Sequence, residues 1–82
     1  MPAIEMYVKL SCPYCVMAKR LLTTKGQEWN EIDIEAQPQR RSEMIERSGR
    51  TTVPQIFIGD RHVGGCDDLF ALDESGELDG LL

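Results

Sequence analysis

Apolar and polar residues alternate at the start of the chain, and the spacing then changes to that of a helix. Residues 4–9 read Ile-Glu-Met-Tyr-Val-Lys, which is the period of a strand. From Pro13 to Lys25 the apolar residues recur at intervals of four, so this segment is predicted to be an α-helix that Gly26 ends. A second alternating run, from about Glu28 to Ile34, predicts another strand.

The middle of the chain predicts a second helix followed by a hairpin. Pro38 is expected early in this helix, and Gly49 is expected to end it. Residues 53–58 are mostly β-branched or apolar and predict a strand. Gly59-Asp60 then forms a turn, and residues 61–63 form a short returning strand.

The last part of the chain predicts a third helix. Gly64-Gly65 interrupts the strand pattern, and Asp67 or Asp68 can cap the helix that follows. Gly76 is expected to end this helix. Three leucines beyond it are predicted to dock the tail against the core: Leu78, Leu81 and Leu82.

The predicted order of elements is βαβαββα, an α/β fold. A strand–helix–strand unit of this length favours two parallel strands joined by a right-handed crossover. The hairpin must add an antiparallel pair. The sequence therefore predicts a mixed four-stranded sheet flanked by helices, formed by residues 1–82 as one domain, since 82 residues suffice for a single small core.

Composition narrows the classes of function. The net charge of −5 argues against nucleic acid as the main partner. No apolar run approaches the length that crosses a bilayer, and the first residues lack the basic and apolar regions of a secretory signal. Three cysteines are too few for a secreted disulfide framework, so the expected compartment is the cytoplasm, where thiols stay reduced.

The pair Cys12 and Cys15 lies where the first strand is predicted to meet the first helix. One helical turn separates the two residues, so their sulfurs can meet. Unpaired N–H groups and the helix dipole favour an anion at Cys12, with Lys9 three residues upstream. Cys12 is therefore predicted to attack disulfides as a thiolate and Cys15 to act as the resolving thiol. The alternative is a pair of buried structural thiols.

Three separated motifs carry a resemblance to a known family. The chain reads Lys9-x-x-Cys12-Pro13-Tyr14-Cys15, then Thr52-Val53-Pro54, then Gly64-Gly65-Cys66-Asp67-Asp68. In these motifs, in its length and in its order of elements, it resembles the glutaredoxins, and most closely the short dithiol kind of bacteria. The resemblance covers essentially the whole chain.

This resemblance implies the thioredoxin fold and a glutathione-dependent thiol–disulfide oxidoreductase. Such an enzyme reduces protein disulfides and removes glutathione from glutathionylated proteins. Glutathione would be its co-substrate, with no bound cofactor, and the protein would be a monomer. The resemblance also implies a cis Pro54 that faces the thiols and leaves the Val53 backbone free to pair with an extended peptide.

The resemblance further implies a binding site for glutathione. The N–H groups of Cys66 and Asp67 suit a carboxylate, and the side chain of Asp67 or Asp68 suits an ammonium group. Lys9 and Arg41 would meet the glycyl carboxylate. The residues implied to bind glutathione are Lys9, Tyr14, Arg41, Thr52, Val53, Pro54, Gly65, Cys66 and Asp67.

Two other functions remain open on the sequence alone. One is a redoxin that a flavoprotein reductase reduces in place of glutathione. The other is carriage of a metal or an iron–sulfur cluster, because four side chains could formally act as ligands: Cys12, Cys15, His62 and Cys66. A single C-x-x-C at a helix start makes a poor zinc site, so no metal is predicted. Cys66 is expected to be a buried bystander, and His62 a solvated or packed residue.

Overall fold

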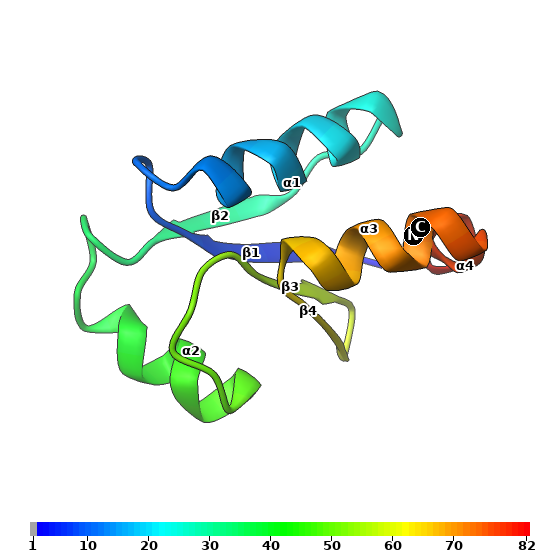
Figure 1. Cartoon of the computed structure of the whole chain (residues 1–82). Coiled ribbons are helices and arrows are strands. Elements are labelled where there is room, and N and C mark those ends of the chain that lie inside the picture. Colours follow the sequence, from blue (N-terminus) through cyan, green and yellow to red (C-terminus); the bar gives the residue numbers. More distant parts are fainter. Residues whose placement is uncertain (1) are drawn as a thin grey trace.

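The computed structural model describes residues 2–82, which form one mixed sheet with helices on both faces (Figure 1). In chain order the elements are β1 (Ile4–Val8), α1 (Pro13–Thr24), β2 (Asn30–Asp33), α2 (Arg40–Ser48), β3 (Gln55–Ile58), β4 (Arg61–Gly64), α3 (Cys66–Ser75) and α4 (Glu77–Leu81). The predicted βαβαββα order is confirmed. The short helix α4 is an addition, at the place where only a docked tail was predicted.

The sheet has the strand order β2-β1-β3-β4. Strand β1 pairs in parallel with β2, with Tyr7 opposite Ile32. It pairs antiparallel with β3, which in turn pairs antiparallel with β4. The crossover through α1 and the C-terminal hairpin therefore give the mixed four-stranded sheet that the sequence predicts.

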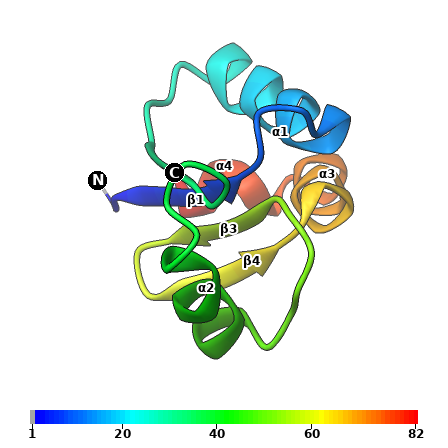
Figure 2. The same cartoon turned by 90° about the vertical axis from the view of Figure 1, so that its left-hand side faces the viewer.

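The larger core lies on the face of the sheet that α1, α3 and α4 cover (Figures 1 and 2). Leu78 of α4 is completely buried there, so the predicted docking of the tail is confirmed. Full burial of a large aliphatic side chain stabilises a fold by about 1.5–3 kcal/mol. The buried residues of this core are Ile4, Met6, Val8, Cys15, Ala18, Leu22, Ile56, Ile58, Leu69 and Leu78.

Helix α2 covers the opposite face of the sheet and is held there largely by polar contacts. Met44 is its only fully buried side chain. The buried Tyr7 hydroxyl donates a hydrogen bond to Glu43 and accepts one of 2.8 Å from Arg47. The Arg47 guanidinium also lies 4.1 Å from the centre of the Phe57 ring, a cation–π distance. Hydrogen bonds between charged side chains and a buried phenol thus hold α2 on the sheet.

The start of α2 differs from the prediction. Pro38 was expected inside the helix, but the helix begins at Arg40. The side chain of Asp33 accepts hydrogen bonds from the N–H groups of Glu35 and Ala36, at 2.9 and 3.2 Å. These bonds fold the segment after β2 into turns, which delay the helix.

Strand β3 begins at Gln55, two residues later than predicted. The Val53–Pro54 peptide bond is cis, and proline has no N–H to donate to a sheet. Residues 52–54 therefore form a loop at the end of the sheet rather than its first ladder positions. This loop is one wall of the candidate site.

Candidate active site

Cys12 lies between β1 and α1, at the N-cap of the helix. Its N–H donates to the Lys9 carbonyl oxygen, and its own carbonyl oxygen accepts from the Val16 N–H, both at 3.2 Å. Pro13 is the first helical residue, where its missing N–H costs nothing. The first N–H groups of α1 have no partner inside the helix, so Cys12 lies at the positive end of the helix dipole.

The two sulfurs of the C-x-x-C pair have different environments. Both are free thiols; Cys12 is half-buried, whereas Cys15 is fully buried in the larger core. The Cys12 thiol donates to the carbonyl oxygen of Val53 at 3.7 Å. Burial raises the pKa of the Cys15 thiol to about 12, with the Cys12 sulfur adding to the shift and the Lys9 backbone opposing it. Cys15 is therefore a neutral thiol at neutral pH.

The start of α3 forms the opposite wall of the site. Gly65 is the N-cap, and its N–H donates to the Asp68 carboxylate at 2.9 Å. The same carboxylate oxygen accepts from Arg50 at 2.8 Å, and this guanidinium lowers the pKa of Asp68 most. A Cβ on Gly64 (φ +116°) would lie 2.3 Å from that oxygen, so the position requires glycine. Asp68, in the first turn of α3, thus caps the N-terminus of its own helix, while Asp67 lies exposed.

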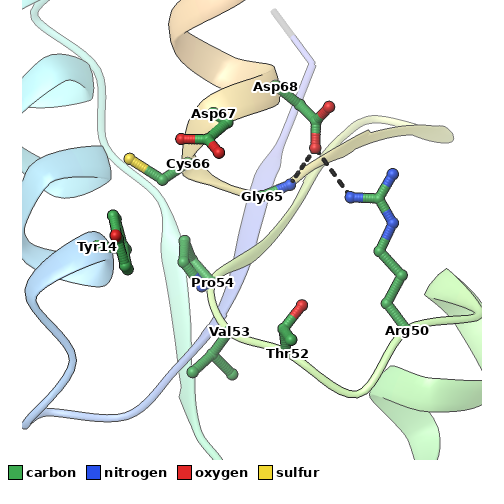
Figure 3. Close-up of a pocket in the computed structure, with 9 residues that line it drawn as sticks. All are labelled: Tyr14, Arg50, Thr52, Val53, Pro54, Gly65, Cys66, Asp67 and Asp68. Atoms are coloured by element: carbon green, nitrogen blue, oxygen red, sulfur yellow. Dashed lines mark hydrogen bonds and ion pairs between the residues drawn. The ribbon is translucent and has the colours of Figure 1, made fainter.

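A groove of about 350 Å³ lies between these walls (Figure 3). The Tyr14 ring stands on one side and the Arg50–Asp68 pair on the other, with Pro54 between them. Positively and negatively charged side chains therefore border the groove. The groove is also next to Val53, whose carbonyl oxygen contacts the Cys12 thiol. The lining residues are Tyr14, Arg50, Thr52, Val53, Pro54, Gly65, Cys66, Asp67 and Asp68.

Comparison with known proteins identifies the family. A family model described as glutaredoxin matches residues 4–63. The chain belongs to the glutaredoxin family. It is 57% identical to glutaredoxin 3 of Escherichia coli strain K12 over 82 residues, which cover 100% of this chain and 99% of that protein.

Solved glutaredoxin structures have the same fold. The solution structure of glutaredoxin from Brucella melitensis superposes with a TM-score of 0.87 at 60% identity, covering 100% of this chain and 89% of that one. A buckwheat glutaredoxin–glutathione complex superposes with a TM-score of 0.91 at 27% identity, covering 99% and 76%. This glutaredoxin therefore has the thioredoxin fold, and family and fold make it a thiol–disulfide oxidoreductase.

The glutaredoxin groove contains most of the residues that the sequence predicted to lie together. Tyr14, Cys66 and Asp67 line it, as do Gly65 and the Thr52–Pro54 loop, and the cis bond that the resemblance implied before Pro54 is present. Burial raises the pKa of Cys66, and the Asp67 charge adds to this shift.

The structure also separates some predicted residues from this groove. Lys9, beside Cys12, and Arg41, exposed on α2, do not line it. Arg50 does line it, and sequence reasoning missed this residue. In the sequence, the only sign that Arg50 belongs to the site is its position between Gly49, which caps α2, and the Thr52 motif. Its partner Asp68 is 18 positions away, so no local pattern links the two residues.

The formal set of metal ligands does not come together. Within residues 2–82, no three His, Cys, Asp or Glu side chains lie close enough to one another to hold a metal ion. His62 contacts Gln55 and stacks on Phe57, with 4.9 Å between the ring centres. Its contacts are thus on the α2 face of the sheet.

Proposed function

We propose that this glutaredoxin uses glutathione to reduce glutathionylated proteins and protein disulfides, with Cys12 as nucleophile and Cys15 as resolving thiol. The observation that carries the proposal is the difference between the two sulfurs. One lies at a helix N-terminus against the wall of a groove, and the other is buried with its pKa raised to about 12. This difference supports attack by Cys12 and a later, resolving step by Cys15.

The chemistry of the groove suits the γ-glutamyl end of glutathione. The N–H groups of Cys66 and Asp67 stand at the start of α3 without partners in the helix, and they suit the α-carboxylate. The exposed Asp67 carboxylate suits the ammonium group, because Asp68 is already paired with Arg50. The buckwheat relative is a complex with glutathione, which supports a tripeptide in this groove.

The rest of the tripeptide is assigned along the loop toward Cys12. Tyr14 and the Thr52–Pro54 loop flank the cysteinyl part, and the Val53 backbone pairs with it as a strand would. Lys9 and Arg41 remain proposed partners of the glycyl carboxylate. Since neither lines the groove, they would meet this carboxylate outside it.

The reaction takes place as two exchanges. The Cys12 thiolate attacks the glutathionyl sulfur of a mixed disulfide, and the protein substrate leaves as a thiolate that takes up a proton. A second glutathione then attacks the Cys12 mixed disulfide, which restores Cys12 and releases glutathione disulfide. With a protein disulfide, Cys15 displaces the substrate from Cys12, and two glutathione molecules reduce the Cys12–Cys15 bond.

The proposed partners are glutathione and proteins that carry disulfides or bound glutathione, and the protein is proposed to act as a monomer in the cytoplasm. No helix within residues 2–82 is long and apolar enough to cross a membrane. The net charge of −5 is not one that attracts nucleic acid.

The assay is the reduction of a glutathionylated peptide, with glutathione disulfide measured through NADPH and glutathione reductase. We expect Cys12→Ser to abolish turnover and Cys15→Ser to retain it, because the reduction of a glutathionylated peptide needs only the Cys12 thiolate and a second glutathione. Both variants should fail to reduce a protein disulfide catalytically. An active Cys12→Ser protein would overturn the assignment. Faster reduction of the oxidised enzyme by a flavoprotein reductase than by glutathione would favour the alternative redoxin function.

A further inference from the structure

Gln55 is a completely buried polar residue, the first of β3, among apolar neighbours. Its amide nitrogen donates to the carbonyl oxygen of Thr52 at 3.0 Å and to the Thr52 hydroxyl at 3.3 Å. Its amide oxygen lies 2.8 Å from Nε2 of His62 on β4. Thr52 belongs to the loop that borders the groove, and His62 lies on the hairpin behind it.

These contacts fix the roles of all the atoms involved. The Gln55 nitrogen faces two oxygen atoms, so the Gln55 oxygen must be the acceptor from His62, and Nε2 of His62 carries the hydrogen. Burial lowers the pKa of His62, so the ring is neutral at neutral pH. Stacking on Phe57 holds the ring in place. His62 therefore orients Gln55, and Gln55 holds Thr52.

The chain of contacts continues to the reactive sulfur. Thr52 precedes Val53, whose carbonyl oxygen accepts from the Cys12 thiol, and Pro54 joins this loop to Gln55. The loop is thus fixed at one end by strand β3 and at the other by the Gln55 amide. We infer that Gln55, oriented by His62, is a positioning residue that holds the Val53 backbone in the conformation that receives the disulfide substrate.

An apolar side chain at this position would stabilise the fold at least as well as Gln55 does. Residues 56–58 of β3 are Ile, Phe and Ile, and a buried amide costs free energy unless every bond is made. Thr52 is exposed, so its carbonyl oxygen could turn to water if Gln55 were absent. The structure would then keep its core while the loop gained freedom, and substrate would have to order it again.

The inference rests on the proposed function and predicts a change in KM rather than in kcat. Gln55→Met keeps the side-chain length and removes the hydrogen bonds to both Thr52 and His62, whereas Gln55→Glu removes only the donor to Thr52. We expect KM for a glutathionylated peptide to rise about tenfold in both, the change expected for one or two lost hydrogen bonds. His62→Phe keeps the stacking and removes only the orienting bond, so KM should rise about threefold.

The matched control is Ile56→Val, one residue along β3 and buried on the opposite face of the sheet. It should leave KM within about twofold of the wild type. The NMR order parameter of the Val53 amide provides a readout that needs no substrate. We expect it to fall in Gln55→Met and to stay unchanged in the control. If Gln55→Met does not fold, His62→Phe decides by the same two measurements.

The outcomes separate the two proposals. An unchanged KM and an unchanged Val53 order parameter in the Gln55 and His62 variants would overturn the positioning role, even if the enzyme reduces the peptide well. A wild-type protein that does not reduce the peptide would overturn the proposed function. The Val53 order parameter would then decide whether Gln55 holds the loop. Equal rises of KM in Ile56→Val and Gln55→Met would also overturn the inference, because general destabilisation would explain both.

Discussion

The burial of Cys15 gives a quantitative prediction for alkylation. In the Cys12→Ser variant the remaining cysteines are both buried, Cys15 completely and Cys66 with 5% of its surface exposed. Burial is the leading cause of the raised pKa of each thiol. Only thiolates react with iodoacetamide at a useful rate, so the folded variant should be nearly inert.

The pKa of about 12 for Cys15 sets an upper limit on the effect, because the Cys12 sulfur adds to this shift and is absent from the variant. At pH 8, an unhindered cysteine of pKa about 8.5 is roughly one-quarter thiolate, while a thiol of pKa 12 is ionised in roughly one molecule in ten thousand. The ratio is roughly 2000. The more basic thiolate is intrinsically about 25–55 times more reactive, from a Brønsted slope of about 0.4–0.5. A thiol with this pKa would react about 40–100-fold more slowly. In the variant the fall due to ionisation is smaller, and steric exclusion by the core adds to it.

The assay compares one protein in two states. Folded Cys12→Ser and the same variant in urea are treated with iodoacetamide at pH 8, and the adducts at each cysteine are counted by mass spectrometry over time. The folded form should react at least about tenfold more slowly, because burial, the leading cause of the raised pKa, is retained in the variant. Cys15→Ser is the matched control, because its Cys12 should be alkylated in the folded state. If the folded Cys12→Ser protein reacts at Cys15 within about fivefold of its rate in urea, our account of the buried resolving thiol is wrong.

Three further predictions concern stability, measured by urea unfolding. Tyr7→Phe removes a buried hydroxyl that bonds two charged side chains of α2, so the free energy of unfolding should fall by about 1–2 kcal/mol, and no loss would show that these bonds contribute nothing. Gly64→Ala places a Cβ 2.3 Å from the Asp68 carboxylate at φ +116° and should cost about 2 kcal/mol or more, whereas Gly80→Ala, with open space around it, should be neutral or stabilising. Because Arg50 lowers the pKa of Asp68 in the folded protein, the stabilisation is present above about pH 4 and is lost as pH falls through the lower folded value. Asp68→Asn should therefore weaken the dependence of the free energy of unfolding on pH below about pH 4, and an unchanged acid profile would contradict this.

The fold was predictable from the sequence because its signals are local. Alternation in residues 4–8 and the four-residue spacing after Pro13 each describe one element, and the glycines after α2 and α3 mark where those helices end. The errors arose where a non-local or side-chain effect decides. The late start of α2 depends on Asp33 bonding to Glu35 and Ala36, and a periodicity does not contain this information.

The site was predictable only as far as its motifs extend. The C-x-x-C pair, the Thr52 loop and the start of α3 each lie in a continuous segment, and the fold brings the loop and the helix start together around the groove. Arg50 was not found because its role depends on a bond to Asp68 on another element. For the same reason the sequence predicts only a solvated or packed role for His62, since its partner Gln55 lies on the neighbouring strand.

The two faces of the sheet contribute different properties to the thiol site. The apolar face encloses Cys15, so its packing sets how hard that thiol is to ionise. The α2 face contains His62 and Gln55, whose bonds fix the loop beside Cys12. A substitution that loosens the core should therefore change the pKa of the resolving thiol and leave loop geometry intact. A substitution on the α2 face should change substrate affinity at constant thiol chemistry, so the two kinds of variant can be told apart by alkylation and by KM.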